Sequence, residues 1–173
     1  MVLTAGIDHF DTVGGRVLGK VIGGAIHMVS DATLQIVENV VVSGSDAIHT
    51  TVDYALSDDQ FIAVVTLIGA ARNRAGNAQS TTLTGNALEN TLAANLGNDT
   101  LTGLGGGDVL NRGAGNDSLL GGKDADTLDG PSGADRVYGE NGDDVLRGRA
   151  WADFLDGGAD DDRLSGSYAA ATL

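Results

Sequence analysis

A large aliphatic residue recurs every nine positions through the second half of this 173-residue chain. The ten members of the series keep one register without a slip: Leu83, Leu92, Leu101, Leu110, Leu119, Leu128, Val137, Leu146, Leu155 and Leu164. A helix would show apolar residues every three or four positions, and a strand of a hairpin would show them every two. One inward residue in nine instead leaves room for a very short strand followed by a six-residue turn.

An aspartate stands two residues before each of the last eight aliphatic positions. These aspartates are Asp99, Asp108, Asp117, Asp126, Asp135, Asp144, Asp153 and Asp162. Glycines fill the turn between aliphatic residue and aspartate, so the unit reads G-G-x-G-x-D-x-U-x, where U is aliphatic. Glycine reaches positive φ at little steric cost, and the pattern therefore predicts a tight turn in every unit. With 27 Gly but only 1 Pro, the chain is neither collagen-like nor a Pro-rich linker.

Two nine-residue units make one flattened coil, and stacked coils bury their aliphatic side chains as a ladder. We therefore predict an all-β fold. The second half is expected to form a right-handed parallel β-roll, or β-helix solenoid, with 18-residue coils. The N-terminal half is expected to be rich in strands that continue the solenoid.

Stacking brings the aspartates of alternate repeats to the same edge of the roll. The edge that we call the Asp99 edge carries Asp99, Asp117, Asp135 and Asp153. The opposite edge, which we call the Asp108 edge, carries Asp108, Asp126, Asp144 and Asp162. Carboxylates one coil apart, ~4.8 Å, repel each other by roughly 3 kcal/mol per pair at an effective dielectric near 20. A cation is therefore expected between successive turns.

Calcium suits these gaps, because it takes six to eight oxygen ligands and both carboxylates and loop carbonyls are hard oxygen donors. Magnesium fits less well, since it demands tight octahedral geometry and keeps its water. Zinc is disfavoured because the chain has 0 Cys and because His9, His27 and His49 all lie outside the repeat. Three gaps on each edge would hold up to six calcium ions.

Residues 97–173 resemble the RTX, or haemolysin-type, calcium-binding nonapeptide repeat. The units at 103–110 (GLGGGDVL), 121–128 (GGKDADTL), 139–146 (GENGDDVL) and 157–164 (GGADDDRL) carry the likeness best. The resemblance implies a parallel β-roll, folding triggered by calcium, and export through a type I secretion channel with an uncleaved C-terminal signal. It also implies carboxylate ligands from the eight aspartates and further metal contacts from turn residues, namely Gly103, Gly106, Gly113, Gly115, Gly121, Asp124, Gly133, Gly139, Gly142, Gly157 and Asp160.

Some turns depart from the pattern. The glycine replacements besides Asp124 and Asp160 are Leu104, Arg112, Pro131, Arg149 and Trp151. The last two fall in the turn before Asp153, so the gap between Asp135 and Asp153 is predicted to be the weakest site. Asn90 and Thr81 stand where aspartate is expected, and the coils there are predicted to hold no metal.

The first eighty residues are harder to interpret. Two β-branched runs that end in glycine, residues 37–44 and 61–69, predict strands. A recurrent pattern of aliphatic residue, any residue, glycine links these runs to the repeats and favours one solenoid with longer rungs over a separate small β-sandwich. The predicted division is a β-rich region at 1–80, degenerate repeats at 81–98 and a calcium-binding roll at 99–173.

The sequence offers little sign of catalysis. Neither H-E-x-x-H nor G-x-S-x-G occurs, so we predict that the protein is not an enzyme. Asp58 and Asp59 are interpreted as the start of a loop rather than an acid/base pair. The aromatic side chains of Tyr138, Trp151 and Phe154 could stack on a carbohydrate, although covering the solenoid surface is the simpler interpretation.

Charge and hydropathy narrow the possible partners. The chain has 24 acidic against 10 basic side chains, a formal charge of -14, which argues against nucleic acid and anionic membranes as partners. The longest apolar run, residues 61–68, is far too short to span a membrane, and the N-terminus lacks the basic and apolar regions of a cleaved leader.

These observations predict a calcium-binding protein that is secreted and acts outside the cell, at the bacterial cell surface or in the medium. The roll would be disordered at low cytosolic calcium and would fold on export. One alternative is a structural subunit that associates end to end into a filament or surface layer, because only residues 165–173 follow the last repeat. A second alternative is an accessory module that binds extracellular polysaccharide, similar to the repeat modules of alginate epimerases.

Overall fold

The computed structural model describes residues 2–3, 8–11, 20–21, 25–29, 46–50, 53–56 and 62–166. Within these residues the regular secondary structure consists of strands alone. The strands are β1 (Val2–Leu3), β2 (Asp8–Asp11), β3 (Lys20–Val21), β4 (Ala25–Val29), β5 (Asp46–Thr50), β6 (Tyr54–Ala55), β7 (Ile62–Leu67), β8 (Asn73–Ala75), β9 (Thr82–Thr84), β10 (Thr91–Ala93), β11 (Thr100–Gly105), β12 (Val109–Asn111), β13 (Ser118–Lys123), β14 (Thr127–Asp129), β15 (Arg136–Asn141), β16 (Val145–Arg147), β17 (Phe154–Ala159) and β18 (Arg163–Ser165).

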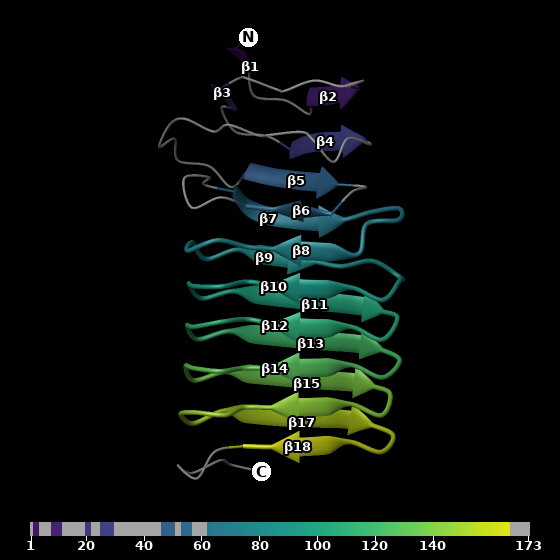
Figure 1. The fold of residues 1–173 in the computed structure, drawn as a ribbon, viewed down its shortest axis with the longest axis vertical. Coiled ribbons are helices and arrows are strands. Elements are labelled where there is room, and N and C mark those ends of the chain that lie inside the picture. Colours follow the sequence, from purple (N-terminus) through teal and green to yellow (C-terminus); the bar gives the residue numbers. More distant parts are fainter. Residues whose placement is uncertain are drawn as a thin grey trace.

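The strands form two long parallel sheets. One sheet has nine strands in the order β2, β4, β5, β7, β9, β11, β13, β15 and β17, and the other has seven in the order β6, β8, β10, β12, β14, β16 and β18. From β6 onward the chain alternates between the two sheets, so successive strands in each sheet are one coil apart (Figure 1). β1 and β3 form a separate parallel pair. The predicted all-β parallel solenoid is confirmed.

Each coil of the repeat region spans two nine-residue units, as the sequence predicts. Leu101 pairs with Leu119 and Leu119 with Val137 in the nine-stranded sheet, while Leu92 pairs with Leu110 in the other. Each member of the ninefold series thus lies directly beside the member two units later. The strands of the seven-stranded sheet are short from β8 onward, three residues each, as one inward side chain per unit requires.

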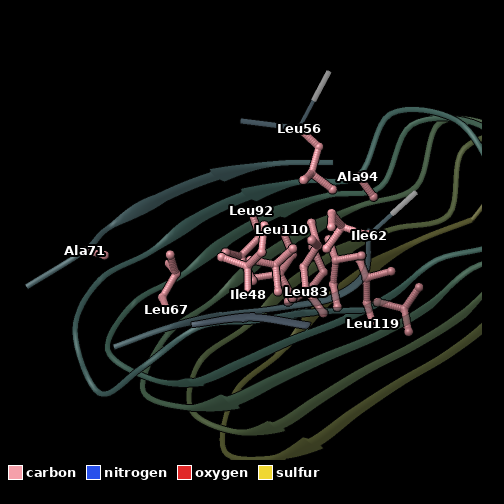
Figure 2. Packing of buried hydrophobic residues seen from close by; sticks show 14 of the residues in the cluster. Ile48, Leu56, Ile62, Leu67, Ala71, Leu83, Leu92, Ala94, Leu110 and Leu119 are labelled. Atoms are coloured by element: carbon pink, nitrogen blue, oxygen red, sulfur yellow. The ribbon is translucent and has the colours of Figure 1, made fainter. Parts of the chain in front are cut away.

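The core is a ladder of these aliphatic side chains between the two sheets. Figure 2 shows Leu83, Leu92, Leu110 and Leu119 pointing into the space between the sheets. All ladder members from residue 83 to 146 are fully buried. Leu164 in β18 is the exception, with 39% of its surface exposed, because β18 is the last strand of its sheet among the described residues.

In the N-terminal half, β2, β4, β5 and β7 continue the nine-stranded sheet and β6 begins the seven-stranded sheet, so these strands extend the solenoid rather than forming a separate sandwich. The coils there are irregular: the step from His9 to its partner His27 equals one coil of the repeat region, whereas the step from His27 to its partner His49 is four positions longer. This longer rung agrees with the prediction of one solenoid with longer rungs. The strand predicted at 61–69 is β7, whereas the strand predicted at 37–44 lies outside the described residues.

Candidate metal centres

The eight aspartates of the repeat each stand directly before a strand, where a turn ends. Their backbone N–H groups form a continuous series of hydrogen bonds, each donated to Oδ1 of the aspartate one coil further along the chain. Along the Asp108 edge these bonds measure 2.6 Å (Asp108 to Asp126), 2.7 Å (Asp126 to Asp144) and 3.0 Å (Asp144 to Asp162). Along the Asp99 edge they measure 2.7 Å (Asp99 to Asp117), 2.9 Å (Asp117 to Asp135) and 3.1 Å (Asp135 to Asp153).

The second carboxylate oxygen, Oδ2, is in a different position. It is buried and accepts no hydrogen bond in seven of the aspartates: Asp99, Asp108, Asp117, Asp126, Asp135, Asp144 and Asp153. Native proteins rarely bury a polar atom without a partner, since the desolvation penalty is left uncompensated. These atoms therefore require a cation or a proton.

The first residue of each turn, five positions before its aspartate, controls the space around Oδ2. We call it the entry residue. On the Asp108 edge the entry residues are Gly103, Gly121, Gly139 and Gly157. A Cβ placed on any of them would lie 2.2–2.4 Å from Oδ2 of the aspartate that ends its turn. The missing side chain therefore leaves a small cradle beside the carboxylate.

The same cradle also contains a carbonyl oxygen from the next coil. A Cβ on Gly103 would lie 2.5 Å from the carbonyl oxygen of Gly121, and a Cβ on Gly139 would lie 2.3 Å from that of Gly157. A carboxylate oxygen of one coil and a carbonyl oxygen of the next thus lie close together beside the entry glycine. This mixed set of hard oxygen donors from two coils is the kind that calcium binds, so the residues present fit the ion.

The other turn residues predicted to contact metal share a backbone conformation, and their metal contacts stay a prediction. They lie in the left-handed region with positive φ: Gly106, Gly113, Gly115, Asp124, Gly133, Gly142 and Asp160. Asp tolerates this conformation better than most residues because its short polar side chain can hydrogen-bond locally. The repeat therefore needs glycine for two reasons: conformational freedom inside the turn, and space at its entry.

Burial sets the electrostatics of the sites. It raises the pKa of Asp99 and Asp126 to about 7, and that of Asp108 and Asp135 to about 6. Hydrogen bonds from the backbone oppose this effect, while the negative charge of neighbouring carboxylates, such as Asp117 beside Asp99, adds to it. The folded chain therefore holds these carboxylates poorly as bare anions near neutral pH.

Among the described residues, no three His, Asp or Glu side chains come together at one point. Each site therefore depends on backbone carbonyl groups as well as carboxylates, which agrees with the cradle geometry. Asp124 also affects these sites through its charge, which raises the pKa of both Asp108 and Asp126. Its Oδ2 accepts a hydrogen bond from the backbone N–H of Gly106.

The coils before Asp99 satisfy their side chains differently. The amide of Asn90 donates from Nδ2 to the carbonyl oxygen of Ala71 at 3.4 Å and to Oδ1 of Asn86 at 3.3 Å. The Thr81 hydroxyl donates to the carbonyl oxygen of Gln79 at 3.0 Å. Internal partners thus satisfy donor groups of both side chains. That the coils there hold no metal stays a prediction.

Arg112 is a functional residue that the sequence flagged only as a missing glycine. It is the entry residue of the turn that ends at Asp117, and its guanidinium is fully buried. Nη2 lies 2.7 Å from Oδ2 of Asp135, whose side chain is also fully buried. The sequence could not show this contact, because it does not reveal that the side chain of an entry residue points toward the next coil.

The aromatic residues gather beside the Asp99 edge. The rings of Tyr138 and Phe154 lie 5.5 Å apart between centroids, and they line a hollow together with Arg136 and Asp153. Trp151 is 66% exposed in the preceding turn.

Asp58 and Asp59 lie outside the described residues. In the part of the chain that is described, no helix has the length and apolar character needed to cross a membrane.

Comparison with known families gives one match. The family model described as RTX calcium-binding nonapeptide repeat (4 copies) matches residues 84–119, 113–146 and 138–167. No curated protein matches the chain significantly. No solved structure does so either.

Proposed function

Because residues 84–167 consist of RTX calcium-binding nonapeptide repeats, we propose that this protein is secreted and that its β-roll folds on binding calcium outside the cell. The roll then serves there as a structural or interaction module without catalytic activity. The observation that carries the proposal is the set of seven buried Oδ2 atoms without a hydrogen-bond partner, aligned along two edges of the roll. Arg112 supplies a positive charge to Oδ2 of Asp135, and the other six atoms still need one.

The proposed mechanism is relief of charge. Without metal, a net charge of -14 and a core one side chain thick oppose the compact state. Calcium, when bound, supplies two positive charges to carboxylate and carbonyl oxygens of successive turns. The Asp Oδ1 atoms hold the coils in register by accepting N–H groups, while the Oδ2 atoms contribute the charged ligands. Because the folded state alone forms the sites, binding energy adds to folding energy, about 2.7 kcal/mol per site at one hundred times Kd.

Circular dichroism during a calcium titration tests this proposal. We expect the β-sheet signal to grow with calcium, in the millimolar range usual for extracellular modules, and to be lost on addition of a chelator. Magnesium at equal concentration serves as the control and should produce a much smaller change. A β-rich spectrum that a chelator leaves unchanged would contradict the proposal.

The metal-binding part of the chain is proposed to be residues 99–173, with 81–98 as coils that need no metal. The internal hydrogen bonds of Asn90 and Thr81 support this division. Hydrogen exchange of the calcium-loaded and chelated protein tests it. Amides from 99 onward should lose protection in chelator to a greater extent than those at 81–98.

Export is proposed to use a type I channel with an uncleaved C-terminal signal. Low cytosolic calcium would keep the acidic coils unfolded before export, and the higher calcium outside would fold them. Expression with and without a type I export system, followed by mass measurement of the protein in the medium, tests this step. The exported chain should keep its full mass and should be absent from the medium without the system.

The hollow lined by Tyr138, Phe154 and Arg136 supports a second candidate function, binding of an acidic extracellular polysaccharide. Aromatic rings stack on sugar faces, and arginine pairs with carboxylates. Calcium-dependent retention on an alginate column that falls in Tyr138→Ala would favour it, and passage without retention would exclude it for alginate.

The exposed Leu164 in β18 supports end-to-end association instead. Light scattering in saturating calcium tests that possibility.

A further inference from the structure

The two edges of the roll differ at their entry residues. On the Asp108 edge all four are glycine, and each leaves a cradle beside an Oδ2 atom. On the Asp99 edge the entry residues are Ala94, Arg112, Gly130 and Gly148. Two of the four therefore carry side chains at the place where the Asp108 edge has only glycine.

Arg112 extends from its own turn into the next coil. The Gly130 Cβ position lies only 1.0 Å from Nη2 of Arg112 and 1.8 Å from Cζ. Gly130 is the entry residue of the turn that ends at Asp135, so the guanidinium lies in the cradle of Asp135. On the Asp108 edge the same place is bordered by a carboxylate and a carbonyl oxygen and contains no side chain.

The guanidinium meets the need that a cation would meet. It carries a full positive charge and lies 2.7 Å from Oδ2 of Asp135, with both side chains 0% exposed. Arginine retains its charge in proteins, and a buried carboxylate held by it has no requirement for a second cation. A calcium ion at this position would also clash with the guanidinium and repel it.

Resting on the proposed calcium function, we propose that Arg112 is a built-in cation that replaces calcium at Asp135. The Asp99 edge is thus held together in its middle by a covalently attached charge, whereas the Asp108 edge depends on free calcium. The roll has one edge that responds fully to calcium and one that responds in part.

The experiment measures calcium bound per chain at saturation, by equilibrium dialysis of the full-length protein against radioactive calcium. Arg112→Gly restores glycine at the entry position and empties the cradle of Asp135, so we expect it to bind at least one ion more than the wild type. Arg112→Ala keeps the Cβ beside Asp117 but removes the guanidinium from Asp135, so it should show the same gain. Arg112→Lys keeps a cation and should leave the count unchanged. Arg147→Gln removes one positive charge from an exposed position on β16 and controls for the change in net charge.

The reverse substitution provides an independent test should Arg112→Gly fail to fold. Gly121 is the equivalent entry residue on the Asp108 edge, and its backbone does not need positive φ. Gly121→Arg should direct a guanidinium toward Gly139 and Asp144 and lower the count by at least one ion more than Gly121→Ala, whose Cβ alone crowds Oδ2 of Asp126. An unchanged count in Gly121→Arg would contradict the proposal.

The outcomes separate this inference from the proposed function. A wild type that binds calcium and an Arg112→Gly variant with the same count would overturn the role of Arg112 alone. A wild type that binds no calcium at saturation would overturn the proposed function and the inference together. A gain in Arg112→Gly with no gain in Arg112→Lys or Arg147→Gln would support the built-in cation.

Discussion

The backbone N–H of Asp108 donates a 2.6 Å hydrogen bond to Oδ1 of Asp126, the aspartate one coil further along the chain. Oδ2 of the same Asp126 carboxylate is buried without a partner. One side chain thus has two roles: the first oxygen fixes the register between coils, and the second is available to a cation. Substitution can separate these roles.

Asp126→Asn should lose the cation and keep the register. The amide oxygen can still accept the N–H of Asp108, as Oδ1 of Asp126 does, but the buried negative charge is gone. We expect at least one calcium ion fewer per chain and more residual β-sheet signal in chelator than in the wild type. Asp126→Ala removes the acceptor too, and should cost the calcium-loaded form about 1–3 kcal/mol.

Equilibrium dialysis, circular dichroism in chelator and urea unfolding in saturating calcium measure these effects. Asp156→Asn, which removes an equal charge from an exposed position on β17, is the matched control and should change none of these results. A full calcium count in Asp126→Asn would show that this carboxylate is not a ligand.

The chelated protein should become more stable as the pH falls from about 7 toward 4. Burial raises the pKa of Asp99 and Asp126 to about 7 and that of Asp108 and Asp135 to about 6, above their values in the unfolded chain. The folded state therefore binds more protons than the unfolded state in this range, and the free energy of unfolding rises on acidification. Asp129, whose pKa is lowered by a hydrogen bond from Arg149, contributes in the opposite direction.

Calcium should reverse the dependence on pH. Protons compete with the metal for the same oxygens, so the calcium concentration at the folding midpoint should increase as the pH falls below 7. Circular dichroism at pH 7.5 and pH 5 measures both trends, as the β-sheet signal of the chelated protein and as the calcium concentration at the folding midpoint. Chelated protein that is less stable at pH 5 than at pH 7.5 would contradict the burial of these carboxylates.

Gly139→Ala should damage one site through lack of space. The new Cβ would lie 2.2 Å from Oδ2 of Asp144 and 2.3 Å from the carbonyl oxygen of Gly157, and the latter belongs to the backbone. We expect a loss of about 1–3 kcal/mol in the calcium-loaded form and weaker calcium binding. Gly105→Ala is the matched control, since its Cβ would meet no atom closer than 4.0 Å.

Calorimetric melting in saturating calcium compares the two glycine variants. The Gly105→Ala variant should melt within a few degrees of the wild type. Equal melting temperatures for both variants would contradict the cradle.

Leu104→Gly should stabilise the roll. Leu104 has φ of 85° and is 48% exposed, so its side chain gains little burial while its backbone adopts a conformation that costs a non-glycine residue roughly 1–2 kcal/mol. In saturating calcium, thermal unfolding should show that the free energy of unfolding of Leu104→Gly is about 1 kcal/mol higher than that of the wild type. Leu104→Ala keeps the unfavourable φ and should show little gain, which separates backbone relief from loss of the exposed side chain.

Much of the fold followed from spacing alone. The series from Leu83 to Leu164 predicted the two-unit coil, and the pairing of Leu101 with Leu119 confirms it. Spacing was sufficient because each unit has one inward position, so no other register buries the ladder. The N-terminal coils have no such series, so longer rungs could be predicted there but not the place or length of the one between His27 and His49.

The candidate sites were predicted less completely. Spacing placed the aspartates on two edges, but it could not divide each carboxylate into a hydrogen-bonded Oδ1 and a free Oδ2. The two glycine replacements Arg149 and Trp151 predict that the gap between Asp135 and Asp153 is the weakest metal site, and this stays a prediction. The effect of Arg112 depends on where an entry side chain points, which requires the stacking of coils in three dimensions.

On both edges, the same N–H to Oδ1 hydrogen bond joins each coil to the next, so one coil can take the place of another. Each coil receives an acceptor from the coil after it and offers one to the coil before it, always at the same sequence separation. Removal of residues 118–135 would place Asp153 one coil after Asp117, and Asp144 one coil after Asp108, with every donor again opposite a carboxylate. Roll length is thus free to vary in whole coils, so duplication or deletion of complete coils can alter the metal capacity while the pairing scheme stays the same.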